Sequence, residues 1–345
     1  MTAANPITRI SAAGDPYDIG QALGRAVGSA VRERVFITSE FQGLAARWRG
    51  SDRLGALEFA ARGAFPRIVR EIEGLAAGAD LDFETVFLWN CRGDLRLPRD
   101  GAEAEGCTCV LLPADDNRPA VIAHNEDGAP EFLGHCYWVD VTPDIGPAFQ
   151  SFMYPGMLPG HTFGMNGAGL VQTINNVRAH DLQPGIPRQV ITRAILGCDS
   201  VDAALALLNR RDRASGFHHA LGEAGSMRVV SVEAPASGCH AEEIGAPAGH
   251  ANHLVYATFR DTPQDITESS RLRQQRTAAP GAEPEPEIIL FDKDTPVYRA
   301  NDTGDDYAQT LATAVFRLFA DRVDWAVHAT PTERRTLSGS VALAG

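Results

Sequence analysis

A cysteine that follows an acidic loop is the first candidate for chemistry in this sequence. Cys107 comes directly after residues 98–106, Pro-Arg-Asp-Gly-Ala-Glu-Ala-Glu-Gly, which are polar and small. Loops of this kind are preferred cleavage sites. If the chain is cut between Gly106 and Cys107, the cysteine becomes an N-terminus whose free α-amine can act as general base for its own thiol. The pattern indicates a nucleophile for amides or thioesters; position alone leaves a buried structural cysteine as the alternative.

The residues before this junction carry helical periodicity. Apolar residues recur at a period near 3.6 over 18–36 and over 54–77, where Pro66 breaks or kinks the run. Asp82 is placed to cap a short helix that ends at Asn90. The segment 1–106 is therefore predicted to be helical.

After Gly106 the pattern changes to short apolar runs, which are typical of strands. Residues 107–113 and 119–124 predict a hairpin, 187–196 and 201–210 predict two helices, and 278–286 predicts a surface loop. Further strands are expected at 135–141, 149–153, 169–174, 227–233 and 250–256, with a closing hairpin at 310–319 and 323–329.

Composition narrows the class of protein. The 345 residues are 44% hydrophobic and carry a formal net charge of −13, so a nucleic-acid partner is not expected. No apolar run reaches the ~18 residues of a membrane helix, and the N-terminus does not resemble a secretory signal, so we expect a cytoplasmic protein without a membrane partner. The six cysteines form no C-x-x-C pair, and His218-His219 lacks a third ligand at metal-site spacing, so no metal site is expected.

Several short motifs occur in a distinctive order along nearly the whole chain. With them, the chain resembles the acyl-coenzyme A:isopenicillin N acyltransferase family, the C45 group of Ntn hydrolases. The motifs are residues 14–20, 71–80 and 90–94 before the junction, Gly106-Cys107-Thr108 at it, and His124-Asn125-Glu126-Asp127, residues 164–170, Asn175-Asn176 and His250-Ala251-Asn252-His253 after it.

This resemblance implies a fold and a set of site residues. The fold would be α+β, an Ntn-hydrolase four-layer αββα sandwich preceded by the helical N-terminal segment. Residues 1–106 would be released by autoproteolysis yet stay associated with the catalytic segment 107–345, the two forming one domain. Cys107 would be the nucleophile, Asp127 would orient the reacting amine and support autoproteolysis, and Asn252 would donate its amide to the oxyanion. The alternatives are a turn residue for Asp127 and a strand-end hydrogen bond for Asn252.

Other residues near these motifs are candidates for lining the cleft. Structural roles remain the alternative for the histidines and for an Arg92–Asp94 ion pair near the cut. Cys109 would share a strand face with Cys107, as core packing or as cleft lining. The cleft-lining candidates are Arg92, Asp94, Thr108, His124, Asn125, Glu126 and His253.

A narrower likeness bears on the reaction. Residues 124–127, 154–160 and 187–193 look closer to the N-β-alanyl-amine (carcinine/β-alanyl-dopamine) hydrolase branch, which implies hydrolysis of a small N-acyl amine. One alternative is acyl transfer to an amine from acyl-coenzyme A or another thioester, and the charge of −13 mildly disfavours a coenzyme A donor. A second is an inactive binding or scaffold homologue. No cofactor is expected beyond acyl-coenzyme A as a co-substrate, and a homo-oligomer stays open.

The junction predicts how the protein matures. The wild type should give two pieces, 1–106 and 107–345, on denaturing electrophoresis, because Cys107 is expected to cut its own preceding peptide bond. Cys107→Ala should stay one chain of 37.0 kDa. An uncut wild type that nevertheless turns over substrate would contradict the N-terminal-nucleophile hypothesis.

Overall fold

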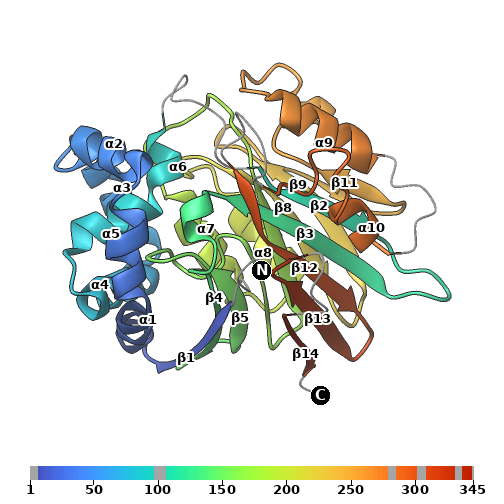
Figure 1. Cartoon of the computed structure of the whole chain (residues 1–345), viewed down its shortest axis with the longest axis horizontal. Coiled ribbons are helices and arrows are strands. Elements are labelled where there is room, and N and C mark those ends of the chain that lie inside the picture. Colours follow the sequence, from blue (N-terminus) through green and yellow to red (C-terminus); the bar gives the residue numbers. More distant parts are fainter. Residues whose placement is uncertain (1–6, 97–105, 279–284, 301–307, 331–335, 344–345) are drawn as a thin grey trace.

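The N-terminal part of the computed structural model is a block of helices, as the periodicity predicted (Figure 1). The model describes residues 7–96, 106–278, 285–300, 308–330 and 336–343, so the predicted loops 98–106 and 278–286 lie largely outside the described residues. The elements of the block are β1 (Thr8–Gly14), α1 (Pro16–Ala30), the π-helix η1 (Val31–Val35), α2 (Ser39–Trp48), α3 (Asp52–Ala64), α4 (Pro66–Ala79), α5 (Phe83–Asn90) and α6 (Arg92–Leu95).

Local sequence signals explain where several of these helices begin. Pro66 occupies the first turn of α4, where its missing N–H costs no helical hydrogen bond, so the predicted break separates α3 from α4. The Asp82 side chain accepts from the Thr85 amide at 2.8 Å, which confirms the predicted cap of α5.

Helices α1 and α4 pack with their backbones in close contact. A Cβ added at Gly74 would lie 2.1 Å from the Tyr17 carbonyl oxygen, and one added at Gly20 would lie 1.9 Å from the Glu71 carbonyl oxygen. Gly24 and Gly78 repeat this one turn further along each helix. Only glycine permits so close an approach of two helices.

The remainder of the chain forms two β-sheets. The eight-stranded sheet has the order β1-β4-β5-β6-β7-β8-β9-β10, and the six-stranded sheet has the order β11-β2-β3-β12-β13-β14. Neighbouring strands are antiparallel except β1 and β4. The strands are β2 (Thr108–Leu112), β3 (Ala120–Gly128), β4 (Tyr137–Pro143), β5 (Phe149–Met153), β6 (Phe163–Asn166), β7 (Leu170–Asn176), β8 (Phe217–Glu223), β9 (Arg228–Ala234), β10 (His240–Glu243), β11 (Ala248–His250), β12 (Gln309–Leu318), β13 (Arg322–His328) and β14 (Leu337–Ala342).

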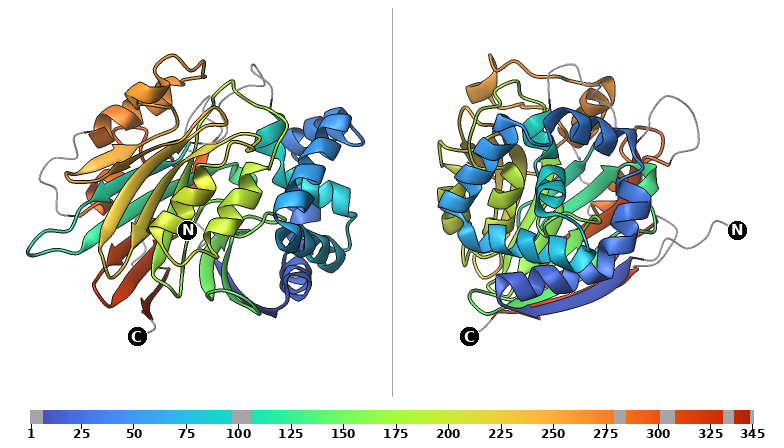
Figure 2. Two further views of the ribbon diagram at one scale, coloured as in Figure 1. Left: turned by 180° about the vertical axis from the view of Figure 1, so that it is seen from behind. Right: turned by 90° about the vertical axis from the view of Figure 1, so that its left-hand side faces the viewer.

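The two sheets stack face to face, with helices on their outer faces (Figure 2). Helices α7 (Arg188–Ile195) and α8 (Val201–Leu208) lie against the eight-stranded sheet, where Gln172 on β7 donates to the Thr192 carbonyl at 2.9 Å. Helices α9 (Glu268–Ala278) and α10 (Glu287–Leu290) lie against β2, β3 and β11 of the other sheet. Every residue of β2, β3 and β7 is buried, because these strands are covered on both faces. Short 3-10 turns occur at η2 (Pro130–Phe132) and η3 (Ala257–Phe259).

The sequence prediction differs from the structure at several elements. The strand expected at 250–256 is wrong, because β11 ends at His250 and the chain then turns. Helices α2 and α9 were not predicted; α9 is a polar segment with few apolar residues to mark a face.

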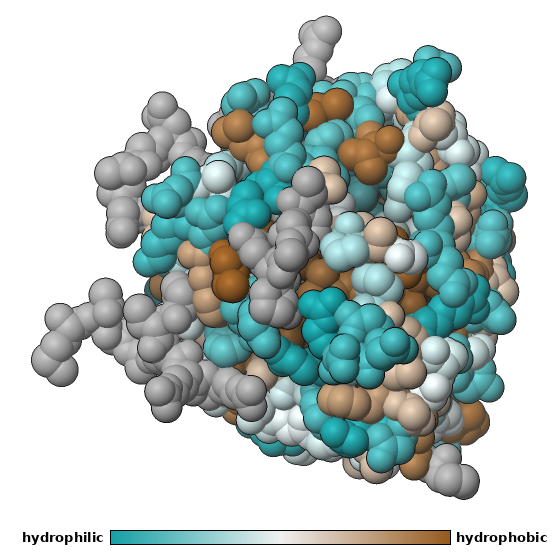
Figure 3. Space-filling model, turned by 90° about the vertical axis from the view of Figure 1, so that its right-hand side faces the viewer, coloured by the Kyte–Doolittle hydropathy of each residue, from teal (hydrophilic) through white to brown (hydrophobic). Residues whose placement is uncertain are grey.

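The distribution of hydrophobic residues on the surface is consistent with the composition. Hydrophobic residues are interspersed with hydrophilic ones on the face in Figure 3, which is ordinary for a surface in contact with water. Within the described residues, none of the helices is both long and apolar enough to cross a membrane.

The α1–α4 contact predicts a stability effect. Gly74→Ala, made in the Cys107→Ala chain to exclude cleavage, should lower the free energy of unfolding by about 1–3 kcal/mol, because the new methyl group overlaps the Tyr17 backbone. Gly55→Ala on the exposed side of α3 is the control, since no atom lies within 4 Å of its Cβ. The control should be neutral or stabilising by up to about 1 kcal/mol. Equal denaturant midpoints for the two variants would contradict the close packing.

Candidate functional site

Cys107 lies at the start of β2, in the space between the two sheets. Thr108 pairs with Asn125 on β3, so the antiparallel register places Cys107 opposite Glu126. The Cys107 side chain is buried, and Cys109 pairs with His124, so both cysteines face the inner layer. Burial raises the pKa of Cys109 to about 12, so this second thiol is suited to core packing.

The thiol of Cys107 contacts a buried carboxylate. Cys107 Sγ lies 3.5 Å from Oε2 of Glu126, and His124 Nε2 lies 3.0 Å from the same oxygen. The hydroxyl of Tyr154 donates to Oε1 of Glu126 at 2.5 Å. Burial and the neighbouring carboxylate raise the pKa of Tyr154 well above its usual range, so the phenol stays a donor. Three neighbours therefore fix the Glu126 carboxylate next to the thiol.

Asp127 lies on the opposite face of β3 from the thiol. Its Oδ1 accepts from Thr310 Oγ1 at 2.6 Å, and its Oδ2 is 4.0 Å from Arg299 Nη1. Burial raises the pKa of Asp127 to about 7, against the lowering effect of Arg299, Arg273 and Thr310. The structure thus brings Glu126 to the thiol and directs Asp127 away from it, toward the layer of α10.

Asn252 is joined to Cys107 through one guanidinium. Arg273 on α9 donates from Nη1 to the Cys107 carbonyl oxygen and to Thr108 Oγ1, and from Nη2 to Asn252 Oδ1 at 2.7 Å. Because a guanidinium can only donate, it fixes the amide oxygen of Asn252 on its own side and turns Nδ2 the other way. That nitrogen donates to the Asn176 carbonyl at 2.9 Å and keeps a second hydrogen.

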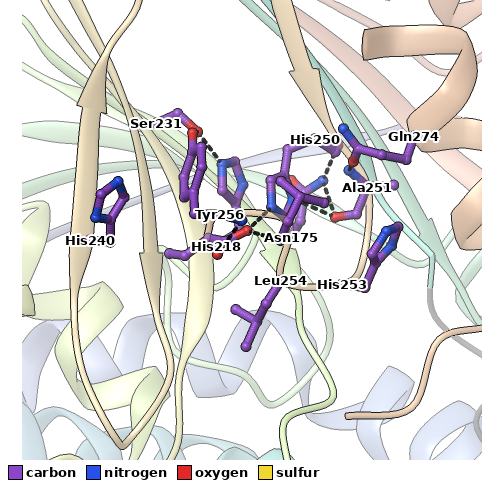
Figure 4. Close-up of polar contacts among 12 residues, drawn as sticks. Asn175, His218, Ser231, His240, His250, Ala251, His253, Leu254, Tyr256 and Gln274 are labelled. Carbon is purple, nitrogen blue, oxygen red and sulfur yellow. Dashed lines mark hydrogen bonds and ion pairs between the residues drawn. The ribbon is translucent and has the colours of Figure 1, made fainter. Parts of the chain in front are cut away.

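A buried polar network holds the backbone at His250 and Ala251, directly before Asn252 (Figure 4). Asn175 Nδ2 contacts the carbonyl oxygens of Cys107, His250 and Ala251 at 3.3, 2.7 and 2.9 Å. His250 Nδ1 lies 2.9 Å from the Ala251 carbonyl oxygen and Nε2 lies 2.9 Å from Glu233 Oε1. A carbonyl can only accept, so Nδ1 carries a proton and the ring is locked in place.

The same network continues behind His250. The His218 ring stacks on His250 with centroids 3.6 Å apart, and its Nε2 lies 2.9 Å from Ser231 Oγ, which also accepts from Tyr256. Burial and the adjacent His250 lower the pKa of His218 well below its usual range, so a neutral ring packs there. This arrangement rigidifies the turn after β11 and gives His218 a structural role.

The remaining cleft-lining candidates are dispersed. His253 Nδ1 lies 2.8 Å from Ser270 Oγ on α9, and burial lowers its pKa to about 4. Asn125 is saturated by Leu290, Val297 and Thr313 under α10.

Arg92 and Asp94 are directed to different neighbours. The Arg92 guanidinium lies over the Trp89 ring, whereas Asp94 accepts from the Arg188 amide and from Ser215. The predicted pairing between them is therefore not among the described contacts. Asp94 instead ties the N-terminal segment to α7 and β8.

Sequence reasoning missed several residues that meet at this site. Each of three such residues contacts a predicted site residue: Arg273, Asn175 and Tyr154. Two arginines also lie against Gly106, since a Cβ added there would be 2.8 Å from a guanidinium nitrogen of Arg273 and 2.5 Å from one of Arg299. The Asn175-Asn176 motif was the signal in the sequence that could have pointed to Asn175 as a site residue. No local pattern in the sequence marks Arg273.

The thiol cluster also has ligand atoms that a metal could use. Atoms of Cys107, His124 and Glu126 lie within 4.8 Å of one another, the one such group within the described part of the chain. Cys, His and carboxylate ligands suit Zn²⁺. The same atoms form the thiol–carboxylate contact described above.

Comparison with known proteins gives the family. A model described as acyl-coenzyme A:6-aminopenicillanic acid acyl-transferase matches residues 114–331, more than half of the sequence, and the chain belongs to this family. The match starts after Cys107. The chain is also 28% identical over 356 residues to the beta-alanyl-dopamine/carcinine hydrolase of Drosophila melanogaster, and the alignment covers 89% of each protein.

A solved structure is also similar to this chain, at a lower sequence identity. A mutant conjugated bile acid hydrolase from Clostridium perfringens matches 69% of this chain and 97% of its own, with a TM-score of 0.38 and 10% identity. The family match confirms the resemblance read from the motifs, and it makes the chain a hydrolase or acyltransferase of this family.

The raised pKa of Asp127 predicts a pH-dependent stability. Between the unfolded value near 4 and the folded value of about 7, the folded protein binds this proton more tightly than the unfolded chain. The free energy of unfolding should therefore fall as pH rises through that window, by on the order of a few kcal/mol. In the Cys107→Ala chain, Asp127→Asn should remove this slope while keeping an acceptor for Thr310. The measurement is denaturant unfolding of both chains from pH 4 to 8. If the free energy of unfolding changes with pH equally in both chains, Asp127 does not titrate in this way.

Proposed function

We propose that the protein is a cysteine N-terminal-nucleophile amidohydrolase that cuts itself between Gly106 and Cys107 and then carries an acyl group on Cys107. The observation that carries this proposal is the contact of 3.5 Å between the Cys107 thiol and the buried Glu126 carboxylate. Two stacked sheets with helices on both outer faces support the αββα assignment.

The first step of the proposed maturation needs a base other than the α-amine, because the Cys107 nitrogen of the uncut chain belongs to an amide. Glu126 is in contact with the thiol and can take its proton. The sulfur then attacks the Gly106 carbonyl carbon, the Gly106–Cys107 C–N bond breaks, and the nitrogen takes the proton from Glu126 and leaves as an amine. Water hydrolyses the resulting thioester, which gives a Gly106 carboxylate and a free Cys107 N-terminus.

The mature enzyme uses the same thiol on an external amide. The α-amine of Cys107 takes the thiol proton, and the sulfur attacks the substrate carbonyl. The α-ammonium then gives this proton to the substrate nitrogen, the C–N bond breaks, and the amine product leaves as the acyl-enzyme forms. Asn252 Nδ2 donates its second hydrogen to the oxyanion, in an orientation fixed by Arg273. Water then releases the acid. Asp127 acts on the Gly106 side of the junction, through Arg299, which lies against Gly106.

The two pieces should remain together after the cut. Strand β1 of the N-terminal segment pairs in parallel with β4 over seven residues on each strand. Glu71 on α4 forms a buried ion pair with Arg193 on α7 at 2.8 Å. Both contacts join residues 1–106 to residues 107–345 noncovalently.

The substrate class follows from the relative. A small N-acyl amine fits a protein similar to a beta-alanyl-dopamine/carcinine hydrolase. Acyl transfer from a thioester to an amine remains the second candidate, favoured by the description of the family model. Both reactions pass through the same acyl-enzyme and differ in whether water or an amine resolves it. An inactive scaffold is disfavoured by the intact thiol–carboxylate contact.

Intact mass spectrometry tests the proposal. The wild type, incubated with a panel of N-acyl amines and acyl thioesters, should gain the mass of one acyl group on residues 107–345, because Cys107 attacks the carbonyl. Cys107→Ala should gain none. Accumulation of free acid marks hydrolysis, and accumulation of a new amide with an added amine marks acyl transfer. A substrate that turns over with Cys107→Ala would exclude this nucleophile.

The oxyanion donor predicts a kinetic effect in the same assay. Asn252→Ala should lower kcat by ~10²–10³ and change KM much less, because the donor matters most when negative charge develops. Asn209→Ala is the control, since that exposed amide at the end of α8 contacts only the Leu205 carbonyl. An Asn252→Ala enzyme with unchanged kcat would remove Asn252 from the mechanism.

A further inference from the structure

A small cavity next to the candidate site is lined by arginines. Its volume is about 190 Å³, and its wall is formed by the ends of β7 and β8, the loop after β7, and the region of α3 and α6. Four guanidinium-bearing residues and two carboxylates carry its formal charges. These are Arg53, Arg96, Arg178, Arg188, Asp181 and Asp265.

The balance of charge in this cavity is opposite to that of the whole chain, which is −13. The four arginines outnumber the two carboxylates, of which Asp265 pairs with His180, also in the wall, at 2.9 Å, and Asp181 accepts from the Ser237 amide at 2.7 Å. Guanidinium groups stay charged at any ordinary pH. The cavity wall is therefore cationic.

The position of Arg188 is built into the fold. Its Nη1 donates to Asn176 Oδ1 at 2.8 Å, and its guanidinium carbon lies 4.0 Å from the centre of the Phe217 ring. A Cβ at Gly93 would lie 1.8 Å from Nη2 of Arg188, so the glycine in α6 leaves the space that this guanidinium occupies.

Asn176 connects the cavity with the catalytic residues. Its side chain contacts Arg188 in the cavity wall, and its carbonyl oxygen accepts from Asn252 Nδ2 at 2.9 Å. The preceding residue, Asn175, contacts the Cys107 carbonyl. A substrate whose reacting carbonyl lies at Asn252 would therefore have its neighbouring groups close to the arginines.

We propose that this cavity binds an anionic group of the substrate, and that the preferred amide is an N-acyl amino acid carrying a free carboxylate. This inference rests on the proposed amidohydrolase function and names its substrate class. Arginine binds carboxylates through paired N–H donors, and burial strengthens such contacts. A substrate with a free ammonium at this point would meet like charges. The volume suits a small fragment, since pockets for drug-sized ligands are about 300–1,000 Å³.

Binding to the wild-type protein tests the proposal without relying on turnover. The probes are N-acetylglycine, its neutral counterpart N-acetylglycinamide, and inorganic phosphate, each titrated calorimetrically at low salt. N-acetylglycine should bind at least about tenfold more tightly than the neutral amide, because only the acid can pair with the guanidiniums. Tighter binding of phosphate than of the acid would overturn the proposal that the cavity binds a substrate carboxylate, and would assign the site to a phosphorylated co-substrate.

Variants locate the binding in the cavity. Arg178→Gln and Arg53→Gln should each weaken N-acetylglycine about tenfold or more and leave N-acetylglycinamide unchanged. Arg178→Lys should restore part of the affinity, because it keeps the charge. Arg322→Gln, a surface arginine paired with Asp321 and Asp324, is the matched control and should have no effect.

These binding experiments test the cavity proposal separately from the proposed amidohydrolase reaction. Equal affinities for the acid and the neutral amide, or an unchanged affinity in both cavity variants, would overturn the cavity proposal even if the acyl-enzyme forms. Selective binding of the acid that is lost in these variants would support the cavity even if no acyl-enzyme is found, in which case the amidohydrolase proposal fails by itself.

Discussion

The register between β2 and β3 is the constraint on which the site depends. Pairing Thr108 with Asn125 places Cys107 opposite Glu126, and both side chains then point into the layer between the sheets. A shift of one residue would exchange the faces and bring Asp127 in place of Glu126. The burial of β3 on both faces makes such a shift costly, because polar and apolar residues would trade their layers.

The second requirement is a rigid turn after β11, since Asn252 has no strand to hold it. The structure meets it with side chains that bond to backbone carbonyls. Asn175 gathers the carbonyl oxygens of Cys107, His250 and Ala251, and Arg273 joins the Cys107 carbonyl to the Asn252 side chain. These buried hydrogen bonds set the position of Asn252 relative to Cys107 before any substrate arrives.

Periodicity and caps were enough to predict much of the fold. Helices α1, α3, α4 and α5 and the β2–β3 hairpin follow from apolar spacing, Pro66 and Asp82. Helix α9 could not be found in this way, because it presents few apolar residues and its buried contact is Arg273. The strand expected at 250–256 failed because Asn175 donates to the His250 carbonyl and Glu233 accepts from the Val255 amide, which hold that backbone in a turn, and these partners are distant in sequence.

The candidate site was predictable in its motifs but not in its geometry. The motifs named Cys107, Glu126, Asp127 and Asn252 as candidates, yet the sequence could not say which of two adjacent carboxylates faces the thiol. That choice depends on the length of the turn from 113 to 119, since one residue more or less reverses every side chain of β3.

The two carboxylates also differ in what their surroundings permit. Glu126 has hydrogen-bond neighbours at both oxygens, Cys107 and His124 at one and Tyr154 at the other. Asp127 has one hydroxyl partner and a pKa raised to about 7 by burial.

In the proposed maturation the base must take a proton from the thiol while the Cys107 nitrogen is still an amide. A carboxylate in contact with the sulfur meets that requirement, and one on the far face of the strand does not. After the cut the new α-amine can serve the same thiol, so a single nucleophile would be activated by Glu126 in the precursor and by its own nitrogen in the mature enzyme.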